Sequence, residues 1–165
     1  MSKSPYIVSN DRLSDVISAI QTLGTYRFYK LGVDSWSERI CGDSAEAAKW
    51  NLIFKEHPEF FRFSSDGSKA SLVLRRQKPK LFDVDALEFV TREERDSRSA
   101  DGQRRITRAP LSENDLKMLI DVAISLHSKA LEDQRDSRWW ISMLTTVGVA
   151  LIGLIGVWLG ARLSP

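Results

Sequence analysis

The chain has 165 residues and a formal net charge of +2, from 24 Lys and Arg against 22 Asp and Glu. Residues 1–80 hold 13 basic and 9 acidic side chains, a mild excess that excludes the dense positive field of a dedicated nucleic-acid binder. The single cysteine, Cys41, excludes an intramolecular disulfide and is typical of a reducing compartment.

The first predicted element is a helix over residues 10–24. Its apolar side chains recur at helical spacing, and Gly24 fits just past its C-terminus. The aromatic segment 25–34 follows, and its composition fits either a strand or an irregular packing segment. The sequence thus predicts an amphipathic helix followed by a short aromatic connection.

Two further helices and a hairpin are predicted next. A brief helix over 35–41 has capping-box residues at its start and ends at Gly42. A third helix over 45–57 ends before Pro58, which supplies no backbone N–H. In FFRFSSDGSKASLVLRR, residues 60–76, alternating apolar side chains flank an Asp-Gly turn, which predicts a two-stranded hairpin.

The order helix, short helix, helix and hairpin over residues 10–80 resembles a winged helix-turn-helix domain. The run from HPEFFRF to SLVLRRQ also resembles small bacterial tail-anchored membrane proteins of unknown function. In winged helices that bind DNA, the third helix enters the major groove and the wing contacts phosphate. The resemblance implies a partner-facing surface made of Lys49, Asn51, Lys55, Lys69, Arg75 and Arg76.

A protein partner is favoured over nucleic acid at this surface. Glu46, Glu56 and Glu59 lie on or beside the third helix, and that helix has no arginine to read guanine. Nucleic acid stays open as the alternative, because the hairpin is basic.

Residues 83–110 change in character. They contain six arginines and several acids with few apolar side chains, so the segment is expected to be a flexible linker. A helical stalk is predicted over 111–138, with an apolar seam that favours self-association.

The segment 139–161 has 23 residues and no charge. As a helix it would reach roughly 34 Å, enough to cross a bilayer, whereas a buried core helix is the alternative. With the short tail 162–165 it predicts a tail-anchored, single-pass protein of the bacterial inner membrane, with its N-terminal domain in the cytoplasm. Small residues on one face predict helix packing in the bilayer and a homo-oligomer: Thr146, Ala150, Gly153, Gly156 and Gly160.

The predicted fold class is α+β: a winged-helix-like domain over 1–82, the linker, and a long helix that continues into the membrane. No enzyme activity, metal or cofactor is expected, because the two histidines, His57 and His127, lie on separate elements and no phosphate-binding glycine loop occurs. The predicted function is a non-catalytic membrane adaptor that presents its domain to a protein partner. The alternatives are a membrane-bound DNA-binding regulator and a small oligomeric membrane assembly or pore-forming effector.

Overall fold

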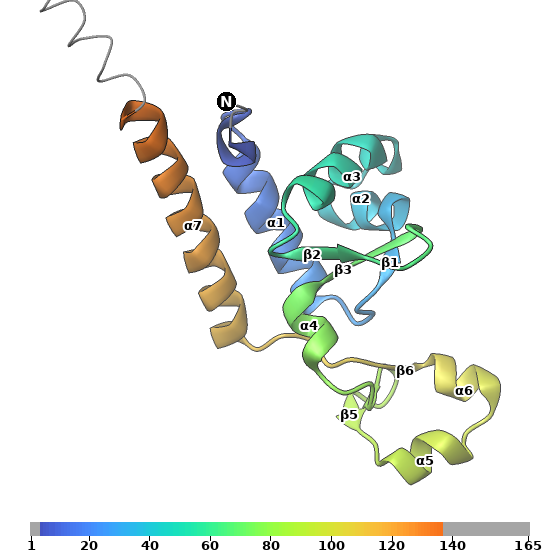
Figure 1. Cartoon of the computed structure of the whole chain (residues 1–165). Coiled ribbons are helices and arrows are strands. Elements are labelled where there is room, and N and C mark those ends of the chain that lie inside the picture. Colours follow the sequence, from blue (N-terminus) through green and yellow to red (C-terminus); the bar gives the residue numbers. More distant parts are fainter. Residues whose placement is uncertain (1–3, 137–165) are drawn as a thin grey trace, which may run out of the picture. The chain divides into compact units, whose positions relative to one another are not determined.

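The computed structural model describes residues 4–136, which form an α+β fold (Figure 1). The described residues contain seven α-helices: α1 (Arg12–Thr25), α2 (Val33–Cys41), α3 (Ala47–Glu56), α4 (Val73–Gln77), α5 (Arg92–Ser97), α6 (Ala100–Arg104) and α7 (Glu113–Asp136). Two 3-10 helices are η1 (Pro5–Ile7) and η2 (Ser44–Glu46). The strands are β1 (Leu31–Gly32), β2 (Phe61–Phe63), β3 (Lys69–Leu72), β4 (Phe82–Asp83), β5 (Glu88–Phe89) and β6 (Ile106–Thr107).

The first three helices and the hairpin turn lie where the sequence predicts them. The second strand of the hairpin is shorter than predicted: it ends at Leu72, and Val73–Gln77 form the helix α4. Helix α2 ends at Gly42, whose φ of 78° suits glycine and whose N–H bonds the carbonyl of Glu38. The β2–β3 hairpin turns through Gly67, with a φ of 71°. The aromatic connection contributes β1, which pairs with β3, so the sheet order is β1-β3-β2 with all pairs antiparallel.

Aromatic side chains join these helices to the first sheet. Phe54 of α3 packs on Phe61 of β2, with ring centroids 4.8 Å apart. Trp36 of α2 is fully buried, and its indole Nε1–H donates to the carbonyl of Ala70 on β3 at 2.9 Å. A buried indole needs such a partner, because an unpaired N–H in the core costs stability. These contacts fix α2 and α3 on one face of the sheet.

Residues 83–110 are folded, so the predicted flexible linker is wrong. Strands β4, β5 and β6 form a second antiparallel sheet in the order β5-β4-β6. Its charges find partners that lie far along the chain: Arg98 pairs with the buried Asp83, and Arg105 Nε donates to Asp85 Oδ2 at 2.8 Å. Ile106 is buried. These ion pairs and the few apolar side chains order a segment whose composition alone indicated disorder.

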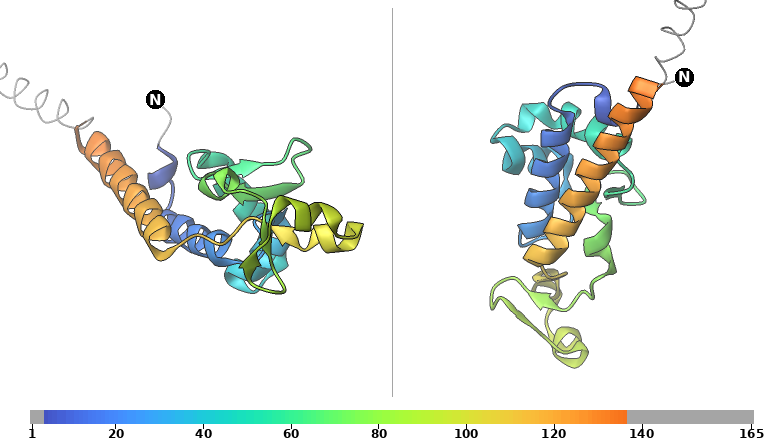
Figure 2. Two further views of the ribbon diagram at one scale, coloured as in Figure 1. Left: turned by 90° about the horizontal axis from the view of Figure 1, so that it is seen from below. Right: turned by 90° about the vertical axis from the view of Figure 1, so that its left-hand side faces the viewer.

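The beginning of α7 packs against the end of α1. The ribbons of Figure 2 show the beginning of α7 beside the end of α1. The N–H of Leu111 donates to the carbonyl of Gly24 at 2.9 Å, and a Cβ built on Gly24 would lie 2.5 Å from Leu116 Cδ2. The chain divides into two compact units at Leu126 and His127, so only the first part of α7 belongs to this first unit. The predicted stalk therefore begins as a packed part of the domain.

The predicted membrane-spanning helix is the second error in the predicted fold class. Within the described part of the chain, none of the helices has both the length and the apolar character needed to cross a bilayer. Helix α7 is long enough at 24 residues, but it carries charged side chains along its whole length. The segment 139–161 lies outside the described residues. The same finding contradicts the predicted location as a single-pass, tail-anchored membrane protein.

Candidate partner-binding surface

Helix α3 presents one face to the core and one to solvent. Trp50, Ile53 and Phe54 are buried, and Trp50 Nε1–H lies 3.4 Å from the sulfur of Cys41. The exposed side chains come from positions spaced by three or four residues, which places them on one helix face. They are Ala48, Lys49, Leu52 and Lys55. We call these four residues the α3 face.

The charge of the α3 face is low. Lys49 Nζ is ion-paired to Asp15 Oδ1 of α1 at 2.8 Å and lies 5.0 Å from the centroid of the Trp50 ring. Lys55 is exposed and has no ion pair within the described part of the chain. Asn51 is half-buried. Of the three predicted contact residues on α3, Lys55 alone is both exposed and without an ion-pair partner among the described residues.

An apolar side chain occupies the centre of the α3 face. Leu52 is 50 % exposed, and its neighbours on the face are Ala48 one turn before and Lys55 one turn after. Single exposed leucines are common, but one flanked by a small residue on a rigid helix offers apolar area at little ordering cost. Helical spacing places Leu52 on the same side as Asn51 and Lys55 and away from Trp50 and Phe54, but the sequence alone does not say which of the two sides is exposed.

The hairpin turn is closed by its own side chains. The carboxylate of Asp66 accepts hydrogen bonds from the hydroxyls of Ser64 and Ser68 and from the backbone N–H of Ser68. These bonds hold the pKa of Asp66 far below its usual range, and the bond from the Ser64 hydroxyl contributes most. Lys69 follows the turn and is exposed. The turn is therefore locally ordered, and its carboxylate is engaged within it.

Arg75 lies in the interior and not on the surface where the sequence placed it. Its side chain is 0 % exposed, and burial lowers its pKa to about 10. The guanidinium donates hydrogen bonds to backbone carbonyls before β1 and after β6, those of Leu23, Tyr26, Arg27, Phe28, Arg108 and Ala109. Arg75 therefore joins the second sheet region to the end of α1, and no partner can reach it.

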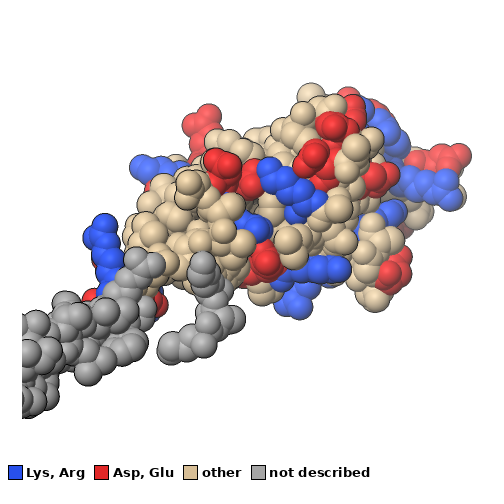
Figure 3. Space-filling model, turned by 90° about the horizontal axis from the view of Figure 1, so that it is seen from above, with Lys and Arg blue, Asp and Glu red and all other residues tan. Residues whose placement is uncertain are grey.

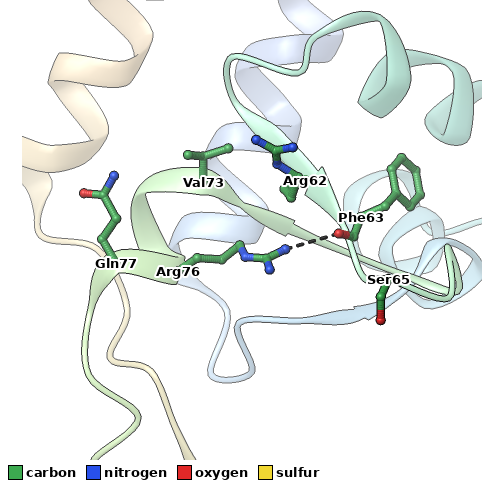
Figure 4. A pocket seen from close by; sticks show the side chains of 6 residues that line it. All are labelled: Arg62, Phe63, Ser65, Val73, Arg76 and Gln77. Atoms are coloured by element: carbon green, nitrogen blue, oxygen red, sulfur yellow. Dashed lines mark hydrogen bonds between the residues drawn. The ribbon is translucent and has the colours of Figure 1, made fainter.

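Arg76, one residue further, is exposed. Its Nη1 donates to the carbonyl of Phe63 at 3.2 Å, and Figure 4 shows the side chain running back from α4 to that oxygen. Beside it lies a hollow that Arg62 also lines. The strand pattern predicts the direction of the Arg62 side chain. Because Arg62 alternates with Phe61 and Phe63, it points away from the helices.

Charges of both signs are interspersed over the surface that Figure 3 draws, with no continuous basic area. The predicted helix-packing residues, Thr146 to Gly160, lie outside the described residues. No protein-family model matches the chain, and comparisons with curated proteins and with solved structures find no match either. The function is therefore inferred from the geometry of the chain itself.

Proposed function

We propose that this chain is a non-catalytic adaptor whose N-terminal domain is of the winged-helix type and binds a protein partner through the α3 face. The order helix, strand, helix, helix and hairpin, with the sheet order β1-β3-β2, supports the winged-helix proposal. Because one fold serves many functions, the choice of partner rests on the surface of α3 and not on the fold.

The observation that carries the proposal is the half-exposed Leu52 at the centre of the α3 face. A helix that reads DNA would present polar side chains there, which hydrogen-bond to base edges. Here the central side chain is apolar, and the charge of Lys49 is offset by Asp15. An apolar anchor with a polar surround is the arrangement found where proteins bind proteins.

A DNA-binding domain is the second candidate, and the hairpin is the observation that favours it. Arg62, Lys69 and Arg76 are exposed and have no carboxylate partner in the described part of the chain. Such side chains can neutralise phosphates, and binding that depends on them falls steeply with salt.

The test places a photo-crosslinking amino acid at Ala48 of the full chain in cells, with the exposed Gln21 on α1 as the control position. We expect a crosslinked protein from position 48 and none from position 21. Leu52→Glu should remove that product without changing the far-UV circular dichroism, since loss of an apolar anchor typically weakens binding by about tenfold or more.

A DNA titration separates the two candidates. Micromolar binding of a mixed-sequence duplex at about 50 mM salt, lost at about 200 mM and in Arg76→Ala, would replace the adaptor by the DNA-binding domain. Equal crosslinking from positions 48 and 21 would contradict the proposed role of the α3 face. The predicted homo-oligomer stays a prediction, for which sedimentation of the full chain is the measurement.

A further inference from the structure

A hollow of 540 Å³ opens between β2 and α4, on the hairpin. Two arginines are its only charged lining residues. The lining consists of Arg62, Phe63, Ser65, Val73, Arg76 and Gln77 (Figure 4). Since none of these residues is acidic, the hollow has a net positive charge.

Both guanidiniums keep donors free for a ligand. Arg76 uses one of its N–H groups for the carbonyl of Phe63, which orients the side chain. No carboxylate of the described residues pairs with Arg76 or Arg62, whereas Arg98 and Arg105 of the second sheet region are each paired with an aspartate. An arginine presents five donors in a planar fork, so these two side chains retain most of their hydrogen-bonding capacity.

The backbone around the hollow is fixed before any ligand arrives. Arg62 is paired with Ser71 in the sheet, and the Ser71 hydroxyl donates to the Arg62 carbonyl at 3.3 Å. Arg76 lies on α4, directly after β3, and its neighbour Arg75 is anchored in the core. A site held on ordered elements loses little entropy when it binds.

We propose that this hollow is the site where a carboxylate side chain of the partner protein binds, so that the partner segment is acidic. The proposal rests on the protein-binding function and adds the chemistry of the partner. Guanidinium forks match carboxylates with two parallel hydrogen bonds, and Ser65 and Gln77 complete the polar part of the lining. Val73 gives the hollow one apolar wall.

The surroundings favour an acidic protein segment over nucleic acid. A nucleic-acid backbone needs a line of cations, because its phosphates recur every few ångströms along the strand. The hollow offers two guanidiniums, and the adjacent turn carries the ionised Asp66. One or two acidic side chains match this pattern of charge better than a phosphate chain does.

The test uses the full chain labelled with 15N-arginine, so that the Nε–Hε signals of Arg62 and Arg76 report directly on the site. The probe is a capped hexaglutamate peptide, with capped hexaglutamine as its uncharged control. We expect saturable shifts of these two signals with hexaglutamate, and none with hexaglutamine. Weak binding is expected, in the millimolar range, because the probe lacks the apolar contacts of a partner.

Variants assign the binding to the hollow. Arg62→Gln/Arg76→Gln should weaken hexaglutamate binding by about tenfold or more, since two charge-assisted hydrogen-bonding groups are removed. Arg62→Gln alone should also weaken binding, and Arg92→Gln on α5, which removes one positive charge elsewhere, is the matched control for this single variant. Arg76→Lys should weaken binding by a smaller factor, because lysine keeps the charge but not the fork.

Three outcomes would overturn the proposal: an equal effect of Arg92→Gln, shifts confined to other arginines, or hexaglutamate binding unchanged in the double variant. Preferential binding of a 12-base-pair duplex or of inorganic phosphate would also overturn it, in favour of nucleic acid or a free anion. Failure here is distinguishable from failure of the adaptor function, because crosslinking from Ala48 depends on the α3 face alone.

Discussion

Replacing Arg75 by Met is expected to cause a large loss of stability. The methionine keeps the volume of the aliphatic stem and removes all the donors of the guanidinium. Six backbone carbonyl oxygens lose a charged donor at once. Some of these oxygens belong to the end of α1 and others to the two residues before Pro110. The change therefore acts on the junction between the two sheets.

The size of the effect follows from two opposing contributions. Hydrogen bonds to a charged group contribute about 1.5–3 kcal/mol each, but bonds from one side chain are not additive and water can replace some of them. The desolvation of the guanidinium opposes them: a pKa lowered from 12.5 to about 10 corresponds to roughly 3 kcal/mol. We expect a net loss of about 3–5 kcal/mol, because several buried carbonyl oxygens are left without a donor at about 1–3 kcal/mol each.

The assay is urea unfolding of the full chain, followed by circular dichroism at 222 nm. Arg75→Lys should lose less than Arg75→Met, because lysine keeps the charge and three of the donors. Arg76→Met is the matched control, since Arg76 is exposed and makes one hydrogen bond to Phe63. It should change the free energy of unfolding by less than about 1 kcal/mol.

Hydrogen exchange adds a local readout. In Arg75→Met the backbone amides of residues 106–109 and of Leu111 should exchange faster, because the carbonyls of Arg108 and Ala109 lose their anchor. If the free energy of unfolding of Arg75→Met lies within about 1 kcal/mol of that of the unmodified chain, the reasoning is refuted. Arg75 would then be a surface arginine, as the sequence predicts.

Three further predictions concern other positions. Burial lowers the pKa of His57 from its ordinary value of 6.5, against an opposing hydrogen bond to Glu59, so the unfolded chain binds the proton more readily. Stability should therefore fall as the pH drops through 6.5, and the fall in urea midpoint between pH 7.5 and 5 should be smaller in His57→Gln. Leu87 is 70 % exposed with a φ of 59°, so Leu87→Gly should raise stability by about 0.5–1 kcal/mol in thermal melts, while Leu87→Ala should bring no gain. Gly24→Ala places a Cβ 2.5 Å from Leu116 Cδ2, the end of a flexible side chain that can turn away, so this contact should do no more than offset the helix propensity gained. The free energy of unfolding in thermal melts should change by less than about 1 kcal/mol, and a loss of more than about 2 kcal/mol would contradict this account.

Local sequence patterns are sufficient to predict the elements of the N-terminal half. Helical periodicity places α1 and α3, Gly42 and Pro58 end helices, and Asp66 with Gly67 forms the hairpin turn. These features depend on neighbours within a few residues, which is why pattern and turn chemistry are sufficient to predict them. The membrane prediction used the same kind of pattern, and it lies on residues outside those described.

Which of two adjacent arginines is buried depends on the fold of the whole chain. Arg75 and Arg76 have the same chemistry, but carbonyls from residues 23–28 and 108–109 converge on the first and not on the second. The order of residues 83–110 was decided in the same way, because Asp83 and Asp85 find their arginines 15 and 20 residues away. Burial and pairing at that separation depend on the path of the whole chain, which local composition does not contain.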